Sequence, residues 1–214
     1  VARWFESAGV LLAAAFALMG SDLHAENVVA GAESPVLVDV ETFLSPELTV
    51  ARTSSPDQAT AQGRVAAWVR SSFLSSGLLT FLEERDSGRV VDIGGLCGQV
   101  SRWVDGVRVT QKNEPRVQGR PRSLAAHGGD VRRGFINGYR ALMDQRARLT
   151  GTPGLSTWFD GAESRVLLRP TRIYSSLLNL WCEPRCQRSG LTIGPAMESL
   201  HRAVVRMENR PPGW

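Results

Sequence analysis

The stretch from 20 to 42, GSDLHAENVVAGAESPVLVDVET, constrains the fold of this chain more than any other. Asp22 is followed five positions later by Asn27, and a short apolar run then ends on Asp39. A hairpin-like return through Gly31 would bring Asp39 back beside the loop that carries the other two, so that three side-chain oxygens converge on one cation. The stretch therefore predicts a polar loop, a hairpin and a cation site.

The order of these three residues is the one that a protein kinase uses. In kinases the loop Asp accepts the proton of the substrate hydroxyl, the Asn five residues on holds magnesium, and the Asp that closes the next strand also holds magnesium. Asp and Asn are common turn formers, and each residue alone would fit an ordinary loop. Their combination favours phosphoryl transfer, with Asp22 as the catalytic base and Asn27 and Asp39 as Mg²⁺ ligands.

Further polar side chains surround the same bend. His24 and Glu26 lie in the loop, and Glu41 follows Asp39 by two positions, which would place both carboxylates on one face of a strand. An ordinary surface loop does not require so many polar side chains around one bend, so this cluster favours a functional site.

The stretch resembles the dehydratase domain of class II (LanM-type) lanthipeptide synthetases. That family has Asp-Leu-His-x-Glu-Asn followed by Pro-Val-Leu-x-Asp-x-Glu-Thr, which residues 22–27 and 35–42 match. Aminoglycoside and choline kinases carry a similar loop, but they place a His two residues before the loop Asp, where this chain has Gly20. The chain also departs from the synthetase pattern at Ser45, since the family usually has His before the following Pro.

The resemblance implies an α+β, mostly helical fold, the C-terminal lobe of a protein/lipid-kinase-like fold with its N-lobe absent. It implies ATP and Mg²⁺ as cofactors, His24 as a further catalytic residue and Glu41 as a further cofactor-binding residue. The implied reaction phosphorylates Ser or Thr of a precursor peptide and then eliminates phosphate to leave dehydroalanine or dehydrobutyrine. Zinc would belong only to a cyclase domain that is missing here. Two alternatives stay open: a small-molecule phosphotransferase, and a degenerate kinase fold that binds peptides without catalysis.

A second informative stretch is RVLLRPTRIY, residues 165–174. It predicts a strand-to-helix junction with Pro170 near the helix start, where phosphate is favoured by the helix N-terminus and by arginines. By themselves the arginines here would fit a solvated surface. The synthetase family, however, has an Arg and a Thr six residues apart that are implicated in phosphate elimination, and Arg165 and Thr171 match them.

With 214 residues and 43% apolar content, the chain can bury a core. We expect one kinase-like region over 1–209 and a tail over 210–214. The region divides into 1–48 with the loop and metal-binding strand, 49–150 with helices and long loops, and 151–209 with the elimination segment. Because the chain opens on Val1 and has no upstream Lys to hold ATP, we expect a fragment that is inactive alone and lacks the N-lobe and cyclase domain of the same protein.

Charge and cysteine content narrow the function further. The net charge of +4 comes almost wholly from Arg, without a basic run interleaved with aromatics, so no nucleic-acid partner is expected. Three cysteines do not make a disulfide framework, which favours a cytoplasmic setting. The apolar segment 10–19 is too short to span a membrane and fits a buried helix better than a signal peptide. Cys182, Cys186 and His201 lack the spacing of a zinc motif.

The remaining segments are assigned by their patterns. Helices are expected over 1–20, 65–74, 134–148 and 195–207, a surface loop over 49–62, a structural glycine turn over 94–98, and a long exposed connection over 99–127 that ends on a loop residue, His127.

Overall fold

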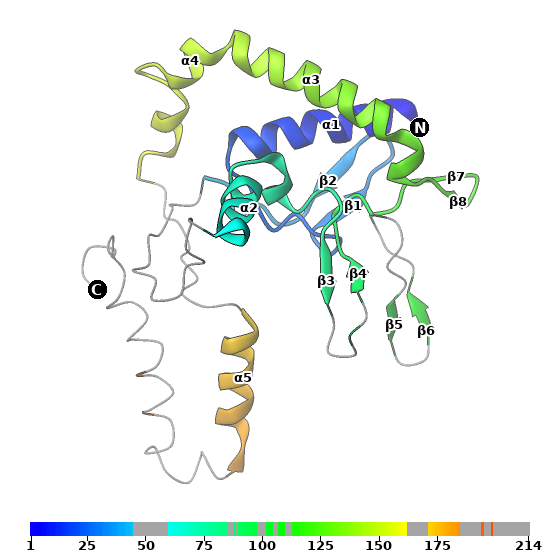
Figure 1. The fold of residues 1–214 in the computed structure, drawn as a ribbon, viewed down its shortest axis with the longest axis vertical. Helices are drawn as coiled ribbons and strands as arrows, with labels where there is room; N and C mark the ends of the chain where they lie inside the picture. Colours follow the sequence, from blue (N-terminus) through cyan, green and yellow to red (C-terminus); the bar gives the residue numbers. More distant parts are fainter. Residues whose placement is uncertain are drawn as a thin grey trace. The chain divides into compact units, whose positions relative to one another are not determined.

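The computed structural model describes residues 1–44, 60–84, 88, 90–97, 102–104, 107–109, 113–161, 171–184, 194 and 198. The chain separates into a larger unit, Val1–Ser45 with Ala61–Glu163, and a smaller unit, Pro46–Thr60 with Ser164–Trp214. Helices and small antiparallel sheets are both present, so the predicted α+β class is confirmed at that level (Figure 1).

The described α-helices are α1 (Ala2–Ala17), α2 (Ala61–Arg70), α3 (Gly128–Asp144), α4 (Arg146–Thr150) and α5 (Thr171–Cys182). Three 3₁₀ helices are described as well, η1 (Phe73–Ser76), η2 (Leu124–His127) and η3 (Leu155–Phe159).

The described strands form antiparallel pairs that each make a two-stranded sheet. These pairs are β1 (Val28–Ala30) with β2 (Pro35–Leu37), β3 (Leu82–Glu84) with β4 (Val90–Asp92), β5 (Arg102–Val104) with β6 (Val107–Val109), and β7 (Arg116–Val117) with β8 (Arg120–Pro121). Two-stranded sheets have little stability of their own, so the helices must supply most of the core.

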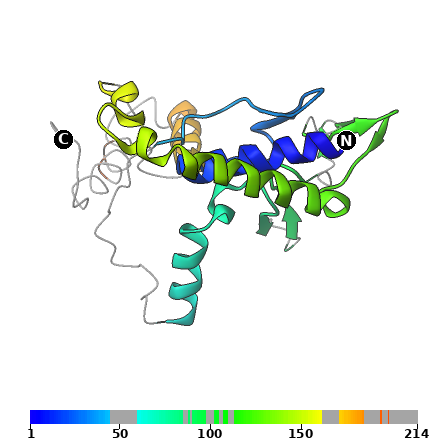
Figure 2. The same ribbon diagram turned by 90° about the horizontal axis from the view of Figure 1, so that it is seen from above.

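Helices α1 and α3 lie side by side along much of their length (Figures 1 and 2). Two glycines allow their close approach. A Cβ atom at Gly9 would lie 2.0 Å from the carbonyl oxygen of Val131, and one at Gly134 would lie 1.9 Å from that of Glu6. Both distances are far below van der Waals contact, so the helix pair requires glycine at these two positions.

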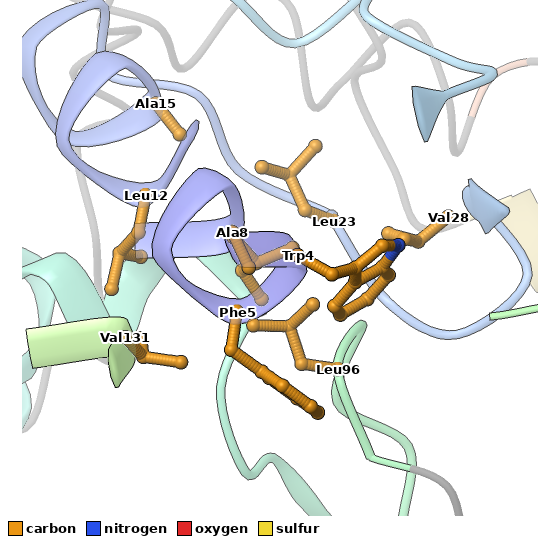
Figure 3. Packing of buried hydrophobic residues seen from close by; sticks show 10 residues of the cluster. Trp4, Phe5, Ala8, Leu12, Ala15, Leu23, Val28, Leu96 and Val131 are labelled. Atoms are coloured by element: carbon orange, nitrogen blue, oxygen red, sulfur yellow. The ribbon is translucent and has the colours of Figure 1, made fainter. Parts of the chain in front are cut away.

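The other face of α1 packs on the segment that carries the predicted site. In Figure 3, Trp4 and Phe5 project from the helix among Leu23, Val28 and Leu96, all of which are buried. Burying side chains of this size contributes about 1.5–3 kcal/mol each. The Trp4 indole N–H also donates to the carbonyl of Gly31, 2.9 Å away, at the tip of the β1–β2 hairpin. Thus α1 positions the loop and the hairpin together.

Some predicted boundaries are wrong. The helix expected over 65–74 is α2 over Ala61–Arg70, followed by η1, and the helix expected over 134–148 begins at Gly128 and is interrupted after Asp144. The first helix is confirmed, with Trp4, Phe5, Ala8, Gly9, Leu12, Ala13 and Ala15 buried. The described part of the chain contains no helix with the length and apolarity needed to cross a membrane. Residues 49–59 of the predicted loop and nearly all of the predicted helix 195–207 lie outside the described residues.

The long exposed connection expected over 99–127 is also incorrect. It contains the β5–β6 and β7–β8 hairpins, and Asn113 between them is fully buried. The arginines and prolines suggested an exposed connection, but Asp105-Gly106 between two valine-containing runs is a strong hairpin signal in the sequence. At the tip of β7–β8, Gln118 and Gly119 both have positive φ, 51° and 74°, as a tight hairpin turn requires.

Candidate functional site

The loop of residues 22–27 follows directly from α1. Leu23 is fully buried, and its backbone N–H donates to the carbonyl of Ser76 at 2.8 Å, which fixes the loop on the end of η1. Asp22, one residue earlier, has a φ of 61° in the left-handed region, where Asp and Asn are more common than other side chains. Its carboxylate is 63% exposed. The buried neighbour therefore holds a carboxylate at the surface.

His24 lies against both Asp22 and Asn27. Its Nδ1 accepts the backbone N–H of Glu26 at 3.2 Å, so the neutral ring carries its proton on Nε2. Nε2 lies 3.6 Å from Oδ1 of Asp22 and 3.4 Å from Nδ2 of Asn27. The ring of His24 therefore lies beside both the Asp22 carboxylate and the Asn27 amide, and the 3.6 Å separation from Asp22 is longer than a hydrogen bond.

The predicted hairpin return is confirmed. Strands β1 and β2 pair with Val28 opposite Leu37, and beyond the last pair the backbone N–H of Val38 donates to the carbonyl of Asn27 at 3.0 Å. Asp39 therefore follows the residue that is hydrogen-bonded to Asn27. The Asn27 side chain is held by the loop itself, because its Nδ2 donates to the carbonyl of Asp22 at 2.9 Å.

The expectation that Asp39 and Glu41 share a strand face is wrong. Strand β2 ends at Leu37, and Oδ1 of Asp39 accepts the backbone N–H of Glu41 at 3.1 Å. Such a contact two residues along the chain is an Asx-turn, a conformation that competes with strand extension. Asp39 and Glu41 thus lie in the turn that follows the strand.

Thr42 closes the site in a way that sequence reasoning missed. Its hydroxyl donates to the carbonyl of Ser21 and accepts the backbone N–H of Ser21 at 3.2 Å. Both ends of the segment that carries Asp22, Asn27 and Asp39 are therefore joined. Thr42 belongs to the matching motif, but the motif alone gives no indication of this contact.

The donors that the sequence assigns to Mg²⁺ suit a hard cation. The amide nitrogen of Asn27 donates to the carbonyl of Asp22, which turns the Asn27 Oδ1 away from that contact. The Asp39 Oδ1 accepts the backbone N–H of Glu41. Among the described residues there is no group of three or more His, Cys, Asp or Glu placed to hold a metal. One carboxylate and one amide, completed by water and phosphate oxygens, is nevertheless a usual protein contribution to a Mg²⁺ site.

The second predicted stretch is described only in part. Thr171 is the first residue of α5, so the helix begins directly after Pro170 as predicted. Arg165 lies outside the described residues, as do Cys186 and His201, so the roles assigned to Arg165 and Thr171 stay predictions.

A polar network at the start of α3 was not anticipated. His127, expected to be a loop residue, ends η2, stacks on Phe5 with ring centroids 4.4 Å apart and contacts Oδ2 of Asp130 through Nδ1 at 2.9 Å. Arg133 pairs with Asp130 and with Glu6 on α1. The hydrogen bonds from His127 and Arg133 hold the pKa of Asp130 below its ordinary value of 3.8. The network joins η2, α3 and α1.

Comparison with known proteins places the whole chain in one family. A family model described as "Domain of unknown function (DUF4135)" matches residues 1–214. The chain belongs to the DUF4135 family. This DUF4135 chain is also similar to the "Lacticin 481/lactococcin biosynthesis protein LcnDR2" of Lactococcus lactis subsp. lactis, with 24% identity over 201 residues. The similarity covers 83% of this chain but 21% of the relative, so the chain spans about a fifth of that protein's length.

Proposed function

We propose that this DUF4135 chain is part of the dehydratase of a lanthipeptide synthetase, a kinase-like lobe that phosphorylates Ser and Thr of a precursor peptide and then eliminates the phosphate. The observation that carries the proposal is the hairpin closed between Asn27 and Val38, which returns Asp39 to the loop of Asp22 and His24. Similarity to a protein of lacticin 481 biosynthesis supports a peptide as the substrate.

In this proposal Asp22 receives the proton of the substrate hydroxyl. Its exposed carboxylate can reach a peptide, and its backbone is fixed between buried Leu23 and the Asn27 amide. His24 lies beside the same carboxylate, with its Nε2 3.6 Å from Oδ1 of Asp22, and would limit the orientations open to it. A base held in this way can act on a hydroxyl within hydrogen-bonding distance.

Asn27 and Asp39 would hold Mg²⁺, and Glu41 would lie beside them toward the nucleotide. When bound, the metal neutralises charge on the ATP phosphates. The chain's own contribution is to hold the backbone of Asn27 next to Val38, the residue before Asp39, through the Val38–Asn27 hydrogen bond, and to join both ends of the segment through the Thr42–Ser21 contacts.

The test is Asp39→Asn in the full-length protein, assayed with ATP, Mg²⁺ and a Ser/Thr-containing precursor peptide. We expect phosphorylation to fall at least a hundredfold, because removing one charge-stabilising group typically costs 10²–10³ in kcat. Glu33→Gln is the matched control, since it removes the same charge from the exposed tip of the same hairpin and should leave the rate unchanged. Mass spectrometry of the peptide measures both.

Three outcomes would contradict the proposal. Normal dehydration by Asp39→Asn would exclude a metal-binding role for this carboxylate. Transfer of phosphate to an aminoglycoside or choline but not to any peptide would instead favour the small-molecule phosphotransferase, and binding of peptide without ATP consumption would favour the non-catalytic fold.

A further inference from the structure

Asn113 is a buried polar side chain that the proposed chemistry does not use. It is 0% exposed, and its Nδ2 donates to two backbone carbonyls, those of Gly95 and Cys97, each at 2.9 Å. Both acceptors belong to the glycine turn of residues 94–97, and they precede Asn113 by 18 and 16 residues. Two carbonyls aimed at one amide nitrogen require a group that donates two hydrogens at this point, which Asn supplies and a carboxylate does not.

The turn held by Asn113 is in direct contact with the loop of Asp22 to Asn27. His24 forms an antiparallel bridge with Gly94, and the backbone N–H of Ala25 donates to the carbonyl of Ile93 at 2.9 Å. A Cβ atom at Gly95 would lie 2.2 Å from the carbonyl oxygen of Leu23. The loop therefore rests on the backbone of the turn with no space for a side chain between them.

The turn is also fixed from its other side, so Asn113 completes a rigid support. Gly95 and Leu96 donate their backbone N–H groups to the carbonyls of Gly77 and Leu78, at 2.9 and 2.8 Å. Asp92 accepts the N–H of Gly94 at 3.0 Å. Of the side chains described around this turn, Asn113 is the one that donates to two of its carbonyls at once, from 16 and 18 residues further along the chain.

We propose that Asn113 is a positioning residue for phosphoryl transfer. It holds the 94–97 turn in place, and this turn fixes the backbone of His24 and Ala25. The effect on phosphorylation rests on the proposed function, whereas the effect on the loop does not. The proposed role belongs to a residue that touches neither substrate nor metal and lies more than eighty positions beyond the loop it supports.

The experiment compares Asn113→Asp with Val131→Ala in the full-length protein. Asn113→Asp keeps the size of the side chain but replaces two donors by an acceptor facing two carbonyls. Val131→Ala removes buried volume from the α1–α3 contact and serves as the control for general destabilisation. Asn113→Ser, which keeps a single hydroxyl donor, replaces the Asp variant if that protein does not fold.

Hydrogen exchange followed by mass spectrometry gives a measure that is independent of activity. We expect the segment 22–27 to exchange at least tenfold faster in Asn113→Asp than in wild type, because the backbone around Ile93 and Gly94, which accepts the Ala25 N–H and bridges to His24, is no longer fixed. In Val131→Ala, hydrogen exchange in segment 22–27 should rise no more than exchange in the rest of the larger unit. Unchanged exchange at 22–27 in the Asn113 variants, or equal acceleration by Val131→Ala, would overturn the proposal.

Kinetics give the second measure, at a temperature where both variants are folded. We expect kcat for phosphorylation to fall about ten- to a hundredfold and the Mg²⁺ concentration for half-maximal rate to rise, since Asn27 belongs to the displaced loop and small misplacements carry large rate penalties. A loss of folded protein alone would lower kcat without moving the Mg²⁺ dependence. An unchanged kcat and Mg²⁺ dependence in Asn113→Asp would contradict the positioning role. Absence of phosphorylation by the wild-type protein would instead contradict the proposed function. In that case the exchange result alone would decide whether Asn113 holds the loop of residues 22–27 in place.

Discussion

At the scale of single residues, the charged network at the start of α3 makes stability depend on pH. His127 and Arg133 lower the pKa of Asp130, so the folded protein binds a proton there less readily than the unfolded chain does. The stabilisation is therefore fully present above the ordinary Asp pKa of about 4 and is lost as the pH falls through the lower pKa of the folded state.

We predict that Asp130→Asn lowers Tm at pH 6, and that the difference in Tm from wild type shrinks as the pH is lowered toward 3. Thermal unfolding followed by circular dichroism across this range measures the effect. Asp144→Asn at the other end of α3 removes the same charge from a helix C-terminus, where an acid is unfavourable, and should not lower Tm. A Tm difference for Asp130→Asn that stayed constant from pH 6 to pH 3 would contradict this assignment.

The residues that the sequence identified are those whose role is local. Asp22, His24 and Asn27 contact one another within one short loop, and their spacing is visible in the chain. Asn113 and His127 could not be recognised in this way, because their roles depend on contacts with residues far away in the sequence. For Asn113 the sequence offered no signal of burial, since polar residues and prolines surround it.

At the scale of secondary-structure elements, α1 supports the loop and hairpin of the candidate site, and glycine sets the spacing between α1 and α3. Gly9 and Gly134 were not recognised as contact residues, since glycine inside a helical pattern usually lowers the expectation of a helix. The hairpin of β1 and β2 was predictable from its turn and apolar run. The β5–β6 hairpin was missed although Asp-Gly marks its turn, because the many arginines around it outweighed that signal.

We predict that Gly134→Ala destabilises the protein although alanine is the better helix former. A Cβ atom there would overlap the Glu6 carbonyl, and overpacking of this kind costs about 1–3 kcal/mol, more than the roughly 1 kcal/mol gained in helix propensity. Gly129→Ala, in the first turn of the same helix, meets no atom within 4 Å and should be neutral or stabilising. Urea unfolding measures both variants, and equal stability of the two would show that the helices are not in close contact at Gly134.

At the scale of the whole molecule, the two proposed half-reactions draw on residues in different parts of the chain. The loop and hairpin of the proposed phosphorylation site belong to the larger unit, and the range Ser164–Trp214, which includes the two residues proposed for elimination, belongs to the smaller one. The chemistry differs as well. Phosphorylation requires a base and a metal, whereas elimination requires loss of the proton α to a carbonyl and stabilisation of the departing phosphate, for which a cation and a hydroxyl are suited.

We therefore predict that Arg165→Ala and Thr171→Ala, each in the full-length protein, still phosphorylate the precursor peptide but do not eliminate the phosphate. Mass spectrometry should show gains of roughly 80 Da per site in place of losses of roughly 18 Da, the masses of a phosphoryl group and of water. Arg169→Ala removes a neighbouring arginine of the same stretch and should dehydrate the peptide normally. If the Arg165 and Thr171 variants yielded only unmodified peptide, both residues would act in phosphorylation itself, and if they dehydrated it normally, neither would act in elimination.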